Sequence, residues 1–159
     1  MKTNAARYLD SLNISYELRD YALDTEDFSA IIVAEKIGLP PEQVFKTLLC
    51  VTSDKEHVFA VVPGNAELDF KKLAHAVGAR KAEMVSLKDI QPLTGYIRGR
   101  VTVFGAKKNF PVYVDETVEL FDTVSVSAGI KGTQIVLSPA DYIRASQATV
   151  ADLTKGGPQ

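Results

Sequence analysis

The chain has 159 residues, 46% of them hydrophobic and 24% charged, and its formal net charge is −2 at pH 7. This length and composition are typical of one globular domain with a substantial core, and we expect a single domain over residues 1–153. The small negative charge excludes the global basic field of a general nucleic-acid-binding protein, although it is compatible with a local basic face.

The first half of the chain alternates helical patterns with β-rich runs. Ser29 and Asp69 are suited to cap the N-termini of two helices, and Gly38 and Gly78 are suited to end them. Two β-rich runs flank the turn sequence SDKE, which predicts a hairpin. We expect helices at 4–12, 30–37 and 70–77, and strands at 14–18, 44–52 and 57–62.

The second half has more strand-like patterns. Ser86 is suited to cap a helical turn that ends near Gly95, and SPAD at 138–141 is a capping box that opens a last helix. The tail at 154–159 is expected to be disordered. The element order is neither regularly βαβ nor all-β, so it predicts an α+β fold with a mixed sheet. We expect strands at 81–85, 96–105, 110–116, 121–127 and 133–137.

No pattern of reactive side chains predicts a metal site or a covalent mechanism. His57 and His75 are isolated in the sequence, and Cys50 has no ligand or base near it. The sequence also lacks G-x-S-x-G, Walker and G-x-G-x-x-G motifs. We therefore expect no metal, no cofactor and no side-chain nucleophile, with Cys50 packed in the core. The single cysteine fits a reducing, cytoplasmic compartment, and the apolar runs are too short to span a membrane.

Lys46 stands in the middle of the apolar run VFKTLLC at 44–50. The ordinary interpretation is an edge-strand lysine whose stem lies on apolar neighbours while its amine reaches water. The alternative is that strand alternation points Lys46 into a concave face, where its amine meets an anionic or carbonyl ligand. Periodicity alone does not separate these two interpretations.

Five segments carry a family resemblance. They are VFKTLL (44–49), LDFKKLAHAVGARKAEM (68–84), TGYIRG (94–99), FGAKK (104–108) and VSAGIKG (126–132), and they occur in this order. The set resembles the YbaK/EbsC family, which includes the editing domain inserted in bacterial prolyl-tRNA synthetases. Within that family the chain is most similar to the free-standing YbaK proteins, which remove cysteine from mischarged tRNA(Pro).

The resemblance implies a fold and an activity. The fold would be a mixed, mostly antiparallel, curved and open barrel-like sheet surrounded by short helices. The activity would be deacylation of mischarged tRNA in trans. A second site that removes the wrong amino acid is needed because small apolar differences between amino acids give a synthetase pocket only about 1–3 kcal/mol of discrimination. An aminoacyl ester is already activated, so positioning and oxyanion stabilisation suffice, with a water or the substrate's own thiol as the attacking group.

The same resemblance implies the partners and leaves alternatives open. The expected partners are the 3′ CCA end of a mischarged tRNA and prolyl-tRNA synthetase, with no role for DNA or a membrane. One alternative is a deacylase for alanine- or serine-charged tRNA, and another is a non-catalytic RNA- or protein-binding regulatory module of the EbsC type. An open cavity that contains Lys46 favours the enzyme, and a filled one favours the binding module.

Matching positions in the family give roles to individual residues. Lys46 matches a near-diagnostic lysine and is assigned to the terminal adenosine and its phosphate or ester oxygens, with Thr47 beside it as a further contact. Tyr21 matches an aromatic residue at the cavity mouth that stacks on the terminal base. Gly99 and Thr102 match a glycine loop against the aminoacyl group, for which a strand bulge is the structural alternative.

A small-residue turn and a set of cations complete the expected site. The turn matches the family's Ser-Gly-Gly and would bring backbone N–H groups to a carbonyl, although a plain β-turn is the alternative. The chain departs from the family pattern at Arg100, Val103, Ala128 and Ile130. The turn consists of Ser127, Ala128 and Gly129, and the predicted basic rim for the acceptor stem consists of Arg98, Arg100, Lys107, Lys108 and Lys131. Arg100 is also predicted to lie beside the substrate.

Overall fold

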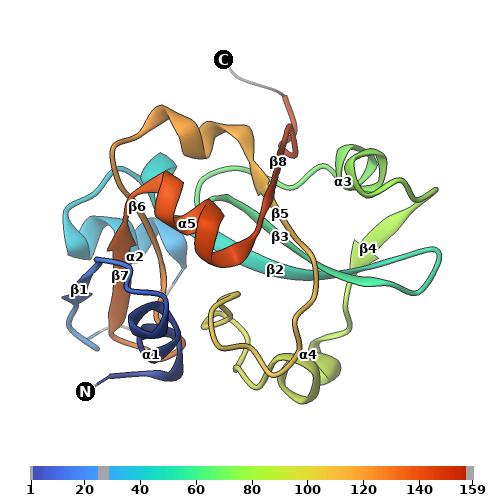
Figure 1. Ribbon diagram of the computed structural model, residues 1–159. Coiled ribbons are helices and arrows are strands. Elements are labelled where there is room, and N and C mark those ends of the chain that lie inside the picture. The colour runs from blue at the N-terminus through green and yellow to red at the C-terminus, as the bar shows by residue number, and fades with distance from the viewer. Residues whose placement is uncertain (1, 25–28, 157–159) are drawn as a thin grey trace.

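The structure, a computed structural model, describes residues 2–24 and 29–156. Its helices are α1 (Asn4–Ser11), α2 (Ala30–Ile37), α3 (Phe70–Val77), α4 (Leu87–Thr94) and α5 (Pro139–Ser146), with 3₁₀ turns at Pro41–Gln43 and Glu116–Leu120. Its strands are β1 (Glu17–Asp20), β2 (Phe45–Thr52), β3 (His57–Pro63), β4 (Ala82–Met84), β5 (Val112–Asp115), β6 (Val124–Ser127), β7 (Thr133–Leu137) and β8 (Thr149–Ala151). Figure 1 shows how these short elements are arranged.

The strands form two sheets. The larger has the order β4-β2-β3-β5-β8 and the smaller has the order β1-β7-β6. The hairpin β2–β3 is antiparallel, whereas β5 runs parallel to both β3 and β8. A parallel bridge between Val44 and Ser125 joins the sheets where β2 begins. The arrangement confirms the predicted α+β fold with a mixed, mostly antiparallel sheet that stays open.

Local signals in the sequence set the helix ends as predicted. The Asp69 carboxylate accepts hydrogen bonds from two backbone N–H groups at the start of α3, and Ser138 Oγ accepts one from Asp141 N at 3.1 Å. Gly38 and Gly78 end α2 and α3 in the left-handed conformation, with φ of 76° and 87°. These caps confirm the predicted starts of α3 and α5 and the predicted ends of α2 and α3, whereas Ser29 and Ser86 precede α2 and α4 without a side-chain cap hydrogen bond.

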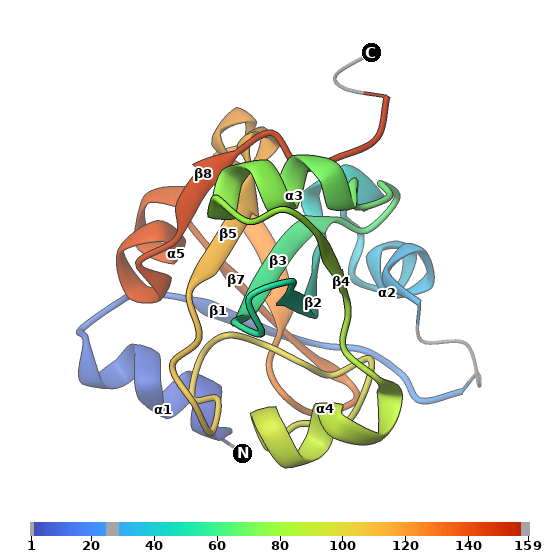
Figure 2. The same cartoon turned by 90° about the vertical axis from the view of Figure 1, so that its right-hand side faces the viewer.

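Alternation along β2 divides the core into two layers. Phe45 and Leu49 pack in the larger cluster between the sheets, while Leu48 and Cys50 face the cluster beneath α3. Figure 2 shows α3 lying across one face of the larger sheet. Cys50 is fully buried, as predicted, and burial raises the pKa of its thiol to about 12.

Several expectations from the sequence are wrong. Residues 96–105 form an irregular loop rather than a strand, and the phenol of Tyr96 turns back to donate to Phe104 O at 2.6 Å. Strand β1 begins at Glu17, later than predicted. Thr154 is buried and bridges to Leu68, so 154–156 are ordered; 157–159 lie outside the described residues. No helix in the described ranges is long and apolar enough to cross a membrane.

Candidate functional site

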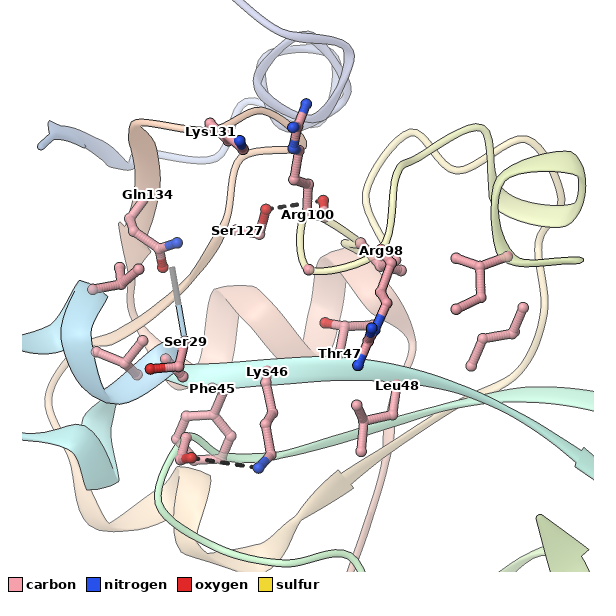
Figure 3. A pocket seen from close by; sticks show the side chains of 18 of the residues that line it. Ser29, Phe45, Lys46, Thr47, Leu48, Arg98, Arg100, Ser127, Lys131 and Gln134 are labelled. Carbon is pink, nitrogen blue, oxygen red and sulfur yellow. Dashed lines mark hydrogen bonds between the residues drawn. The ribbon is translucent and has the colours of Figure 1, made fainter. Parts of the chain in front are cut away.

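A cavity of about 710 Å³ opens beside the first half of β2. The neighbouring strand β4 pairs only with Cys50–Thr52, which leaves the earlier part of that edge facing the cavity. Figure 3 shows β2 as its floor, with the 98–101 loop and the end of β6 on the opposite side. This volume lies within the range of small-molecule sites.

The backbone of β2 contributes to the floor of the cavity. Gly64 N donates to Val44 O and Thr52 N donates to Glu56 O, so the even-numbered residues of β2 direct their backbone groups toward β3. The N–H and C=O groups of Phe45 and Thr47 consequently face the other edge, where the cavity lies. The Thr47 side chain lines the cavity as well.

Lys46 is half-buried and borders two cavities. It lines the large one, and it also lines a smaller hollow of about 400 Å³ together with Leu48 and Glu67. Its Nζ makes a long hydrogen bond of 3.4 Å to Gly64 O instead of extending into solvent. Burial lowers the pKa of Lys46, and the negative charge of Glu67 partly opposes this shift. The Lys46 amine is thus a partly desolvated cation that lies against the backbone of Gly64.

The 127–129 turn is hydrogen-bonded within the protein. Ser127 Oγ donates to Arg100 O and accepts from Gly129 N, both at 3.0 Å, and Ala128 N donates to Thr133 O at 3.3 Å. A Cβ at Gly129 would lie 2.6 Å from Tyr96 Cε1, so close packing against Tyr96 explains why a glycine stands at this position. Ser127 lines the cavity, but the N–H groups of Ala128 and Gly129 are already engaged, contrary to the role expected for them.

The predicted cations separate into two groups. Arg98, Arg100 and Lys131 line the cavity, whereas Lys107 and Lys108 are exposed outside its lining. Figure 3 shows Arg98 reaching toward β2, and Arg100 turned away from β2 toward the rim near Lys131. Arg98 was predicted at the rim, and Arg100 was predicted both at the rim and beside the substrate.

Of the remaining predicted residues, Tyr21 and Gly99 line the cavity and Thr102 does not. Thr102 is fully buried, and its Oγ1 has no hydrogen-bond partner among the described residues. Gly99 has a φ of 83° and open space around its Cβ position, so its conformation, not a close contact, explains the glycine.

Two features of the cavity were not predicted from the sequence. One is Gln134, a buried polar residue on β7 that accepts a 2.8 Å hydrogen bond from Ser125 Oγ; its only sequence signal was a polar residue in an apolar strand. The other is an exposed apolar rim formed by Ile31, Met84 and Leu87. The described residues contain no group of three or more His, Cys, Asp or Glu placed to hold a metal ion.

Proteins of known sequence are similar to this chain along most of its length. A protein of Enterococcus faecalis (strain ATCC 700802 / V583), named as a candidate Cys-tRNA(Pro)/Cys-tRNA(Cys) deacylase, EbsC, is 41% identical over 153 residues, covering 96% of this chain and 93% of its own. The multifunctional Ser/Thr-tRNA deacylase ProXp-y of Escherichia coli (strain K12) is 26% identical over 127 residues, covering 77% and 76%.

A solved structure supports the fold. A crystal structure described as a candidate trans-editing enzyme for prolyl tRNA synthetase matches with a TM-score of 0.83 and 23% identity, covering 98% of this chain and 99% of its own. The model of the aminoacyl-tRNA editing domain matches residues 28–145, which include β2, the 98–101 loop and the 127–129 turn. The chain therefore belongs to the aminoacyl-tRNA editing domain family.

Proposed function

We propose that the protein is an aminoacyl-tRNA deacylase that removes cysteine from mischarged tRNA(Pro). The observation that carries the proposal is the open cavity with the half-buried Lys46 in its wall, since a filled cavity would have favoured a binding module. The choice of cysteine is supported by the 41% identical relative, whose name specifies Cys-tRNA(Pro) and Cys-tRNA(Cys). Such a protein acts where tRNA is charged, in the cytoplasm, beside prolyl-tRNA synthetase.

The cavity fits one aminoacylated nucleotide. Lys46 pairs with the phosphate or ester oxygens of the terminal adenosine, and Tyr21 lies at the wall where its ring can stack on the base. The attacking water or substrate thiol adds to the ester carbonyl carbon, and the bond to the ribose oxygen breaks. That oxygen takes up the proton that the attacking group releases, so no protein nucleophile is required.

The direct test measures ester loss from tRNA(Pro) charged with Cys, Ala, Ser or Pro. We expect loss of cysteine at a rate well above that of buffer, with Pro-tRNA(Pro) left intact. Release of a thiolactone would identify the substrate thiol as the attacking group, and release of free cysteine would identify water. Preferred cleavage of Ala- or Ser-tRNA would reassign the substrate, and tRNA binding without ester loss would support the regulatory module.

Neither a metal nor the protein thiol should be needed for the reaction. EDTA and Cys50→Ser should each leave kcat within about twofold, because Cys50 is fully buried away from solvent and no ligand cluster lies among the described residues. Cys50→Ser should lower the free energy of unfolding by about 1–3 kcal/mol, since it buries a hydroxyl. Loss of activity that added zinc restores would contradict this expectation.

Arg100 should act on the tRNA backbone, not on the amino acid. Arg100→Gly is expected to weaken cleavage of all charged tRNAs alike and to flatten the salt dependence, because a phosphate contact releases counterions. Arg98→Gly is the matched comparison, since Figure 3 shows that side chain reaching into the cavity. A changed ratio of Cys to Ser cleavage in Arg100→Gly, with an unaltered salt slope, would assign Arg100 to the amino acid instead.

A further inference from the structure

Gln134 occupies a buried position in the cavity wall. It lies on β7, the central strand of the smaller sheet, and pairs across to Ser127 on β6. Only 7% of the residue is exposed, yet it lines the cavity. Figure 3 shows its amide nitrogen turned toward the cavity interior. An amide in such a place needs partners, because burying a polar group without a hydrogen bond is costly.

One half of this amide is fixed by the protein. Ser125 is fully buried, and its Oγ donates to Gln134 Oε1 at 2.8 Å. This bond leaves Nε2, with its two N–H groups, facing the cavity, and within the described residues Nε2 has no hydrogen-bond partner. Gln134 is therefore a donor held in one orientation by a buried hydroxyl.

The ligand group that suits this donor follows from its chemistry. An amide N–H pair donates and does not accept, so it pairs with an oxygen and not with the α-ammonium group of an aminoacyl ester. Phosphate oxygens are better matched by the cations Lys46, Arg98 and Arg100. The N–H groups of the nearby turn, at Ala128 and Gly129, already donate inside the protein. Among the acceptors of the substrate, the ester carbonyl oxygen is the one on which negative charge develops during the reaction, so a fixed donor has its largest effect there.

We propose that Gln134 is a catalytic residue whose Nε2 donates to the carbonyl oxygen of the aminoacyl ester, and that Ser125 is the residue that positions it. The inference rests on the proposed deacylase function. When the attacking water or thiol adds to the carbonyl carbon, negative charge gathers on that oxygen, and a preoriented donor stabilises it. Gln134 transfers no proton in this step; the carbonyl double bond re-forms as the electron pair of the ester bond leaves with the ribose oxygen, which takes up the proton from the attacking group.

The experiment compares three variants with the wild type under saturating Cys-tRNA(Pro). Gln134→Met keeps the length of the side chain and removes both donors, and we expect kcat to fall by about 100-fold with little change in KM. Ser125→Ala leaves Gln134 in place but unanchored, and we expect kcat to fall by about tenfold. Gln43→Met is the control, since Gln43 donates to Thr123 O at 2.7 Å and does not line the cavity.

Each outcome decides the matter. Wild-type kcat in Gln134→Met, or a rise in KM alone, overturns the proposal, and so does an equal loss in Gln43→Met. If circular dichroism shows that Gln134→Met is unfolded, Ser125→Ala decides: an unchanged kcat in that variant overturns the proposal. A wild-type protein that cleaves no charged tRNA contradicts the deacylase function itself, so the two failures are told apart.

Discussion

Replacing Lys46 by alanine should lower kcat/KM for ester cleavage by about 100-fold or more while the protein stays folded. The expected loss is large because the half-buried Lys46 amine is partly desolvated, and a charged contact with the substrate is worth more there than at the surface. Steady-state kinetics on the preferred charged tRNA measure it. Lys108→Ala is the control, since Lys108 is exposed outside the cavity lining.

The effect of Lys46 on the stability of the folded protein gives an independent check of its burial. Burial holds the pKa of Lys46 below its usual 10.5, so at neutral pH the charged amine destabilises the folded protein. The free energy of unfolding therefore increases as pH rises from the lowered pKa toward 10.5, because in this range the unfolded chain binds more protons at Lys46 than the folded protein does. Lys46→Met should raise the melting temperature at pH 7 by on the order of 2 °C and should lack this pH dependence. Wild-type activity in both variants would leave Lys46 as a structural residue of the wall.

Gly129→Ala should strongly destabilise the protein. The residue has a φ of 93°, and the added Cβ would lie 2.6 Å from the Tyr96 ring, which is itself held by its hydrogen bond to Phe104 O. Strain and overlap together should lower the free energy of unfolding by about 3 kcal/mol in chemical denaturation.

Gly99→Ala separates the two causes. Gly99 shares the left-handed conformation, with a φ of 83°, but has nothing within 4 Å of the Cβ position, so only about 1 kcal/mol is expected. Combining Gly129→Ala with Tyr96→Leu should recover part of the loss, because contacting residues are not additive. Equal losses at Gly129 and Gly99 would show that contact with Tyr96 is not what requires a glycine at 129.

The sequence predicted those parts of the fold that depend on local signals. The hairpin β2–β3 and the caps Asp69 and Ser138 follow from turn chemistry and side-chain hydrogen bonds within a few residues. The 96–105 segment was mistaken for a strand because β-branched and aromatic residues also fill buried loops, as Tyr96 and Phe104 do here. Strand β8 was missed because three residues carry too little periodicity.

The site was predictable only where family resemblance marked a position. Lys46, Thr47 and Tyr21 do line the cavity, but their contacts were not readable from periodicity. The orientation of Arg100 toward the rim could not be predicted from periodicity, because strand alternation does not apply in a loop. Gln134 was not predicted as a site residue because its orientation depends on a hydrogen bond from Ser125, which lies on another strand.

The strand order has a consequence for synthesis on the ribosome. Glu17 of the early strand β1 pairs with Val136 of β7, and Val44 at the start of β2 is bridged to Ser125. A nascent chain that ends before β6 thus carries Lys46 on its hairpin but lacks the opposite wall with Ser127 and Gln134. Such long-range pairing forms late and leaves strand edges exposed until then. The growing chain should gain the ability to hold a charged tRNA end only when its last third has emerged, and fragments cut short of β7 should aggregate through the unpaired edge of β1.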